Sequence, residues 1–152
     1  MELRQRILAD TKEAMKSKDS ARLSTLRLIT AAFKDREIAG RGDGGGDELS
    51  SSDLLDILGK MVKQRQESAR AYEEGGRLEL AEKELEEIRI IQEYLPRQMD
   101  SAEVEAAVSA VIADLGADNV RDMGRVMAEL KSRHLGQMDF GAVGPLVRAR
   151  LM

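Results

Sequence analysis

The chain has 152 residues, of which 34% are charged and 42% hydrophobic, with two Phe, two Tyr and no Trp. This length allows one domain or two small ones, and their cores must be built from aliphatic side chains, as in helical bundles. The absence of cysteine excludes disulfides, thiolate catalysis and thiolate metal sites. No apolar run approaches the ~20 residues of a membrane span, and the N-terminus has no uninterrupted hydrophobic stretch. We therefore expect a cytoplasmic protein without a membrane partner.

The formal net charge is -4, but it is unevenly distributed along the chain. Between Lys12 and Arg41 there are eight basic and four acidic residues, whereas between Glu73 and Glu93 there are three basic and eight acidic ones. The overall sign argues against indiscriminate nucleic-acid binding. The early part nevertheless offers basic helical surfaces.

Four helices are expected before Pro96. An apolar stripe predicts a first helix that ends near Lys18, and a second helix follows to about Ile38. Residues 40–48, GRGDGGGDE, predict a flexible linker, because repeated glycine costs much backbone entropy to order. A second helical hairpin then turns at Gly75 and ends at Pro96. The stripes of these helices contain Leu3, Ile7, Ala14, Met15; Leu23, Leu26, Ile29, Phe33; Leu54, Leu58, Met61, Ala69, Tyr72; and Leu78, Ala81, Leu85, Ile88, Leu95.

After Pro96 the side chains become smaller and three short helices are expected. Asp100 and Glu103 have the spacing of a capping box, Gly116 suits a helix C-terminus, and a last helix should begin after Asp139. No strand-like alternation is present. The sequence thus predicts an all-α fold, with an N-terminal helical hairpin bundle of about four helices in residues 1–95 and a small three-helix domain in residues 98–152.

No residue pattern indicates catalysis or cofactor binding. His134 is the only histidine, which excludes a two-histidine metal site, and we expect it to be an exposed helix-end residue. The glycine-rich linker lacks the Lys-Ser/Thr ending of a phosphate-binding loop. The glutamates between Glu79 and Glu87 lie on an amphipathic helix and are best interpreted as a solvated acidic face. We therefore predict no catalytic residue, no metal site and no cofactor.

Three positions are unusual. Arg22 lies on the apolar face of its helix with Leu26, and Arg65 is placed similarly, so each guanidinium needs a partner. Carboxylates at the edge of the core are the favoured interpretation, and a phosphate site between the hairpins is the alternative. Gly124 in mid-helix costs about 1 kcal/mol relative to alanine, which either close helix packing or close approach of a ligand would explain. The basic residues around it favour the ligand.

Four motifs in order carry a resemblance that extends over nearly the whole chain. They are Arg22-Leu-Ser-Thr-Leu-Arg27, Lys63-Gln-Arg-Gln-Glu-Ser68, Glu93-Tyr-Leu-Pro-Arg-Gln98 and Arg121-Asp-Met-Gly-Arg-Val-Met127. Together they resemble the YqeY family, which is similar to the C-terminal tail of the GatB subunit of aspartyl/glutamyl-tRNA amidotransferase and to a domain of some glutaminyl-tRNA synthetases. The resemblance implies an N-terminal helical domain followed by a small three-helix domain. It also implies a role in holding tRNA, because the amidotransferase active sites lie elsewhere in that complex.

The chain departs from the family pattern near its end. Where the family usually has Lys-Gly-Arg-Ala-Asp-Gly, this chain has Ser132-Arg-His-Leu-Gly-Gln-Met-Asp139. Pro145 falls inside the last predicted helix, where it should kink or restart it.

The leading hypothesis is a non-catalytic tRNA-binding accessory module that contacts the tRNA backbone by charge and shape, with an aminoacyl-tRNA synthetase or amidotransferase as a possible protein partner and with no DNA. The expected contacts are Arg121, Gly124, Arg125, Lys131, Arg133 and His134. A competing placement uses Arg22, Arg27, Lys34, Lys60 and Lys63.

Two other classes of function were considered. In the first, the protein is a protein–protein adaptor whose acidic fourth helix docks a basic partner. In the second, it is an independent amidase or ligase, which the lack of a nucleophile–base pair disfavours. Family similarity carries a label of carbon–nitrogen ligase activity with glutamine as amide donor, and we expect this chain not to perform that reaction alone.

Overall fold

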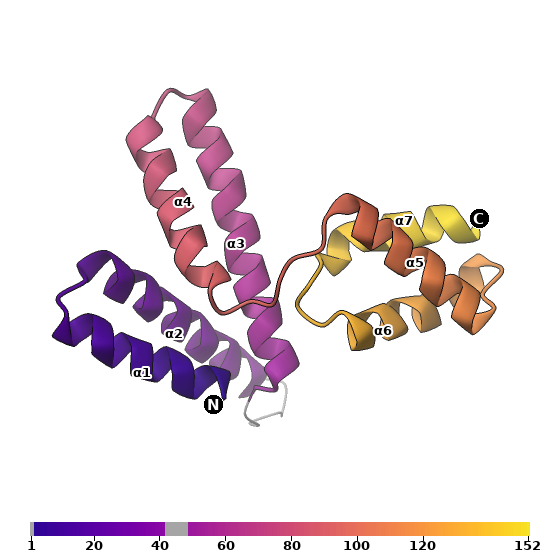
Figure 1. The fold of residues 1–152 in the computed structure, drawn as a ribbon, viewed down its shortest axis with the longest axis horizontal. Coiled ribbons are helices and arrows are strands. Elements are labelled where there is room, and N and C mark those ends of the chain that lie inside the picture. Colours follow the sequence, from indigo (N-terminus) through magenta and orange to yellow (C-terminus); the bar gives the residue numbers. More distant parts are fainter. Residues whose placement is uncertain (1, 42–48) are drawn as a thin grey trace. The chain divides into compact units, whose positions relative to one another are not determined.

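The computed structural model describes residues 2–41 and 49–152, and within these ranges the chain is helical. The described part contains seven α-helices and one short 3-10 helix, without a strand, so the prediction of an all-α fold is confirmed (Figure 1). None of the described helices is both long enough and apolar enough to cross a membrane. The chain divides between Leu95 and Pro96 into two compact units.

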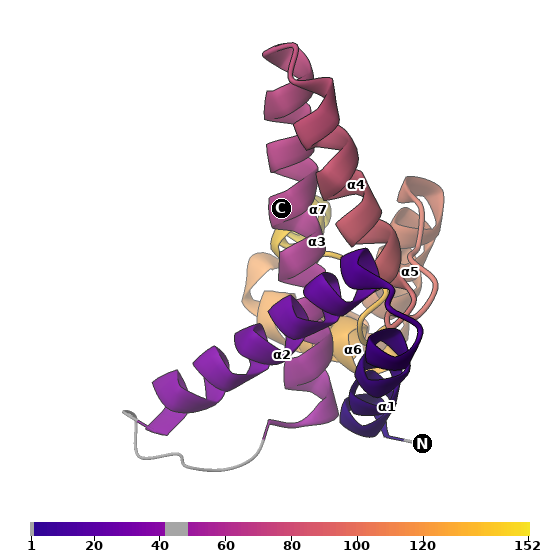
Figure 2. The ribbon, with the colours of Figure 1, turned by 90° about the vertical axis from the view of Figure 1, so that its left-hand side faces the viewer.

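The N-terminal unit consists of two helical hairpins. Helices α1 (Leu3–Lys16) and α2 (Ser20–Arg41) form the first, and α3 (Ser51–Glu74) and α4 (Leu78–Gln92) form the second (Figures 1 and 2). A capping box formed by Ser50 and Asp53 begins α3. Gly76, at φ +74°, turns the chain into α4, a conformation that favours glycine. Helix α2 extends three residues beyond the predicted end at Ile38, and residues 42–48 of the predicted linker lie outside the described residues.

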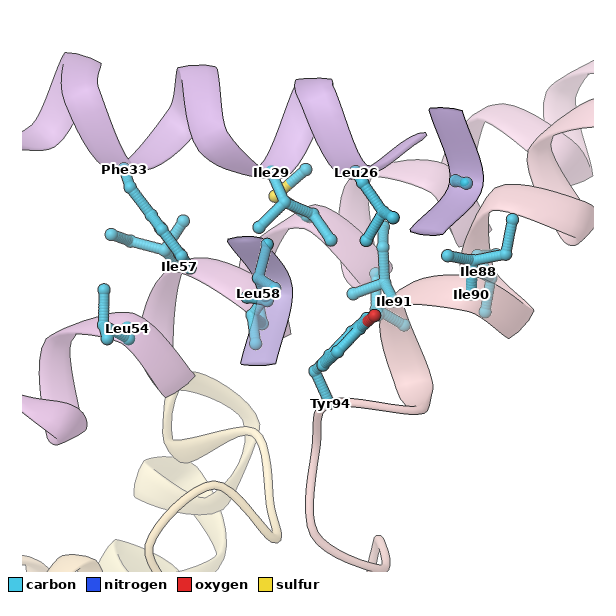
Figure 3. Close-up of a cluster of buried hydrophobic side chains, with 14 residues drawn as sticks. Leu26, Ile29, Phe33, Leu54, Ile57, Leu58, Ile88, Ile90, Ile91 and Tyr94 are labelled. Carbon is cyan, nitrogen blue, oxygen red and sulfur yellow. The ribbon is translucent and has the colours of Figure 1, made fainter. Parts of the chain in front are cut away.

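Aliphatic side chains from α2, α3 and α4 make the core of this unit. Figure 3 shows Leu26, Ile29 and Phe33 pointing from α2 toward the second hairpin, where Leu58 and Ile91 are completely buried. Each fully buried side chain of this size contributes roughly 1.5–3 kcal/mol relative to an exposed one. The predicted apolar stripes therefore form the contact between the hairpins.

The C-terminal unit has three α-helices around a smaller core. These are α5 (Ser101–Leu115), α6 (Met123–Arg133) and α7 (Phe140–Leu151), with the 3-10 helix η1 (Val120–Asp122) directly before α6. The predicted capping box of Asp100 and Glu103 is present, and Gly116 ends α5 in the left-handed conformation at φ 62°. The buried side chains of this unit include Val108, Val111, Val126, Leu130 and Val147.

The sequence predicted that Pro145 would kink or restart the last helix, and the helix does not restart there. Helix α7 runs from Phe140 to Leu151 with Pro145 inside it. A proline at this position removes only the backbone hydrogen bond to the carbonyl of Gly141, which is in the exposed first turn and accessible to water. The rest of the helix is held by its buried face, formed by Val143, Val147 and Leu151.

Each unit has its own hydrophobic cluster, which leads to the prediction that each folds alone. Fragments 1–95 and 96–152, expressed separately, should both show helical circular dichroism and a cooperative thermal transition. The shorter fragment should be the less stable, because small domains bury a smaller fraction of their surface. A fragment that gains helical structure only when mixed with the other would contradict the division.

Candidate nucleic-acid interface

The residues proposed to contact tRNA lie on one continuous stretch of the C-terminal unit. Arg121 lies in η1, Gly124 is the second residue of α6, and His134 follows the last residue of α6. Arg121 and Arg125 belong to different elements, because the chain changes from 3-10 to α-helical geometry between them. Gly124 also lies in the first turn of α6 rather than in its middle.

Two of the predicted cations are paired with carboxylates. Arg125 donates to Asp122 at 3.0 Å and to the Leu115 carbonyl, at the end of α5, at 3.5 Å. Arg133 donates to Asp114 of α5 at 2.8 Å and to Glu129 at 2.9 Å. The hydrogen bond with Asp114 is the main cause of the raised pKa of Arg133. These two arginines therefore connect α6 to the C-terminal end of α5, and their charge is largely compensated.

Two other predicted cations keep their charge available. Arg121 is exposed, and its side chain has no acceptor within the described ranges. Lys131 is also exposed, and its ammonium group lies 6.0 Å from the centre of the Phe140 ring, a cation–π contact that leaves its charge uncompensated. His134 is half-buried instead of exposed, and its backbone N–H donates to the Leu130 carbonyl at 2.9 Å.

The sequence analysis missed Arg148 of α7. A Cβ added to Gly144 would lie 3.7 Å from the Cε atom of Met123, so α7 passes close to the start of α6. Arg148 lies one turn further along the same side of α7, which also contacts η1, and it is exposed. Its side chain, like that of Arg121, has no acceptor in the part of the chain that the structure describes. The sequence places Arg148 one helical turn after Gly144. Only the packing of α7 on η1 shows that this side of α7 lies near Arg121 and its element.

Gly124 is open on its outer side. A Cβ added there would meet no atom within 4 Å, and the residue is exposed. Close helix packing within the described residues therefore does not explain the glycine. Of the two explanations that the sequence offered, the close approach of a ligand remains.

The N-terminal candidates also divide into cations that have a carboxylate partner and cations that do not. Arg22 donates two hydrogen bonds of 2.8 Å to the two carboxylate oxygens of Glu93, and this pairing lowers the pKa of Glu93. Arg65 donates to Glu87 at 2.9 Å and to the Met61 carbonyl at 3.1 Å. The carboxylate partners expected for Arg22 and Arg65 are thus present.

The remaining N-terminal candidates are on the outside of the unit. Lys60 is 3.2 Å from Asp56, and Lys63 is exposed on the same helix. Arg27 and Lys34 are exposed seven residues apart on α2, and no acceptor for either side chain occurs among the described residues. The structure therefore does not bring the five N-terminal candidates together into one site.

A polar cluster that the sequence analysis missed surrounds the end of α4. The hydroxyl of Tyr94 donates to Asp10 at 2.5 Å, and the Arg6 guanidinium lies 5.1 Å from the centre of the Tyr94 ring. Burial, followed by the hydrogen bond to Asp10, raises the pKa of Tyr94 to about 12. With Arg22 and Glu93 beside it, this cluster connects α1 and α2 to the residues that lead out of the unit.

The exposed cations of η1, α6 and α7 suit the binding of anions. Across the described ranges, no three side chains able to ligate a metal come together. A shallow hollow between α5 and α7 is lined by Ser109, Ile112, Ala113 and Arg150, with a volume of about 260 Å³. The cations Arg121, Lys131 and Arg148 have the chemistry of phosphate contacts.

The family model described as Yqey-like protein matches residues 4–151. The chain belongs to the YqeY family. This confirms the resemblance inferred from the four motifs. It also means that all the candidate contact residues lie within the part of the chain that the family shares.

Several yeast proteins are similar to this chain. A protein of Lachancea thermotolerans named "Altered inheritance of mitochondria protein 41, mitochondrial" is 34% identical over 112 residues, 72% of this chain and 58% of that protein. Its namesake in Kluyveromyces lactis is 34% identical over 109 residues, 70% of this chain and 56% of that protein. The namesake in Clavispora lusitaniae is 41% identical over 86 residues, 57% of this chain and 47% of that protein. The chain thus spans about half the length of these relatives.

The expectation of a cytoplasmic location is contradicted by these relatives, which carry mitochondrial names. Composition and hydropathy exclude only certain classes of targeting segment. The absence of cysteine likewise fits any reducing compartment. Neither observation distinguishes the cytoplasm from an organelle.

The Arg22–Glu93 pair should contribute to stability in a pH-dependent way. Because the pKa of Glu93 is lowered in the folded state, its contribution is complete above its unfolded value of about 4.5 and is lost as the pH falls through the folded value. Glu93→Gln should lower the free energy of unfolding by about 1 kcal/mol at neutral pH, after allowance for solvent screening. Urea unfolding at neutral pH and near pH 2 should show this difference shrinking in acid.

The matched control for this variant is Glu86→Gln. Glu86 pairs with Arg89 of its own helix, so its loss disconnects no second element. Its effect should be smaller than that of Glu93→Gln. An equal loss in both variants, or a difference that persists in acid, would refute the role given to Glu93.

Gly124→Ala should stabilise the protein. The position is helical and the added methyl group meets nothing within 4 Å, so the gain should be about 0.5–1 kcal/mol. Gly59→Ala is the control, because Gly59 is exposed within α3 and is equally open. Thermal unfolding of both variants measures the effect. A loss of stability specific to Gly124→Ala would show that the backbone there needs glycine.

Proposed function

We propose that this chain is a non-catalytic tRNA-binding accessory module that contacts backbone phosphates through the exposed side of η1, α6 and α7. The observation that carries the proposal is a set of exposed cations on these elements, Arg121, Lys131 and Arg148, for which no carboxylate partner occurs among the described residues, together with the open backbone of Gly124. Cations of this kind bind phosphates and release counterions.

The charge balance of the segment favours shape-dependent over indiscriminate binding. Residues 118–134 contain four Lys or Arg and three acidic residues, so the free cations are few. Phe140, the one aromatic residue of the C-terminal unit, is half-buried under Lys131. Contacts to phosphates at set distances, without base stacking, fit a folded RNA such as tRNA.

Protein partners in this proposal are an aminoacyl-tRNA synthetase or an amidotransferase, which would supply the catalysis. The ligase chemistry associated with the family is assigned to the partner in this proposal. The alternative of an adaptor whose acidic helix α4 docks a basic partner is less well supported. On α4, Arg89 donates to both Glu82 and Glu86 and compensates much of the acidic face.

Substitution of the free cations should weaken tRNA binding. The variant Arg121→Ala/Lys131→Ala/Arg148→Ala should bind all tRNAs less tightly, and the salt dependence of the binding constant should flatten by about one unit of log–log slope per lost contact. Its melting temperature should change little, because these side chains make no ion pair. Fluorescence anisotropy with labelled bulk tRNA over a salt series measures both quantities.

Two control variants separate this site from its alternatives. Arg125→Ala/Arg133→Ala should affect the melting temperature more and the salt slope less, because these cations are already paired. Arg27→Ala/Lys34→Ala removes two free cations of the N-terminal unit. If that variant abolishes tRNA binding while the triple variant retains it, with both folded, the placement on the C-terminal unit is wrong.

Gly124→Ala adds a test of the backbone contact. If a phosphate approaches the backbone there, the variant should be more stable and yet bind tRNA less tightly. Gly59→Ala should be more stable with unchanged binding. Unchanged binding by both variants would remove Gly124 from the site.

A further inference from the structure

The outer surface of the first hairpin combines apolar and basic side chains. Helix α1 uses Arg6 and Asp10 on one side to reach Glu93 and Tyr94 at the end of α4. On another side of α1, Arg4 pairs with Glu37 of α2 and lies over the Phe33 ring, and Leu8 and Met15 follow Arg4 along that side at helical spacing. The surface beside this contact includes exposed residues of both helices. We call this surface the outer hairpin face, and its residues are Leu8 and Met15 of α1 and Arg27, Ala31, Lys34 and Ile38 of α2.

The apolar side chains of this face are unusually exposed. Leu8 is 57% exposed, Met15 54% and Ile38 63%. Leu8 and Met15 are seven residues apart, as are Ala31 and Ile38, so each pair forms a stripe along its helix. Single exposed apolar residues are common, but two parallel stripes on adjacent helices have the pattern of a contact surface.

The charge on this face is positive and uncompensated. Neither Arg27 nor Lys34 has an acceptor within the described ranges, and both are exposed. Among the neighbouring acids, Glu37 is paired with Arg4, whereas Asp35 lies at the margin of the face. The face thus presents apolar stripes flanked by free cations.

We propose that the outer hairpin face docks an acidic amphipathic helix of a partner protein. An added helix would pack its apolar residues against Leu8, Met15 and Ile38, in the way that helices fill grooves between other helices. Its acidic residues would lie opposite Arg27 and Lys34, and this charge complementarity gives orientation and speed of association. RNA would use the two cations but leave three exposed apolar side chains uncovered, and the face has no exposed aromatic ring for base stacking.

The inference is independent of the proposed tRNA site, which lies on the C-terminal unit. It differs from the adaptor hypothesis drawn from the sequence, since there the docking helix was the acidic α4 of this chain. Here this chain supplies the basic surface and the partner supplies the acidic helix.

The test uses the full-length chain and a designed fluorescent peptide of about 20 residues, roughly 30 Å when helical. The peptide carries leucines at helical spacing on one face and glutamates on the flanks, and a second peptide has lysines in place of the glutamates. Anisotropy should show binding of the glutamate peptide and not of the lysine peptide. Circular dichroism should show that the glutamate peptide gains helicity on binding.

Variants of the face and of a matched surface locate the contact. Leu8→Ser/Met15→Ser and Arg27→Ala/Lys34→Ala should each weaken binding by about tenfold, and only the second should reduce the salt dependence. Leu78→Ser/Leu80→Ser is the control, because these residues are 66% and 40% exposed. They lie at the start of α4, next to the turn of the second hairpin. That variant should bind normally.

Several results would overturn the proposal. One is equal binding of the two peptides, or no binding of either. Another is an equal loss in the Leu78→Ser/Leu80→Ser control. Binding of the chain to phosphatidylglycerol vesicles without binding of the glutamate peptide would reassign the face to a lipid surface. A larger loss of tRNA binding than of peptide binding in Arg27→Ala/Lys34→Ala would reassign it to RNA.

Discussion

The availability of each exposed cation depends on whether a carboxylate lies within reach of it. Arg22 is held by Glu93 across 71 residues of sequence, and Arg133 is held by Asp114 across 19. In both cases the pair fixes one helix against another, so the guanidinium serves the fold first. Arg121, Lys131 and Arg148 in one unit, and Arg27 and Lys34 in the other, are among the described cations that the fold does not use. These surfaces carry the functional proposals.

The core imposes the second constraint. Because the chain has only four aromatic residues of the Phe and Tyr types, aliphatic stripes must supply the contacts between helices. They do so in two separate clusters, and Tyr94 joins the N-terminal cluster to a charged network. The hydrogen bond from its hydroxyl group to Asp10 holds α1 against the residues that follow α4.

The helices could be predicted from sequence because their signals are local. Apolar spacing, the Asp100–Glu103 capping box and Gly116 each act within a turn or two, and the structure places them as expected. The partners of the cations could not be predicted, since Arg22–Glu93 and Arg133–Asp114 depend on which helix faces pack together. Arg148 was missed for the same reason, and Gly124 was placed in mid-helix because the switch from 3-10 to α-helical geometry at Met123 leaves no clear mark in the sequence.

The chain belongs to the YqeY family and has an all-α fold of two compact units. We propose that the free cations on its folded surface bind the phosphates of tRNA. The most direct measurement is the affinity of the unaltered chain for bulk tRNA across a salt series. The account predicts binding that weakens linearly on a log–log scale as salt rises, with a slope that corresponds to about three phosphate contacts. Absence of binding at the lowest salt concentration, where phosphate contacts are strongest, would contradict it.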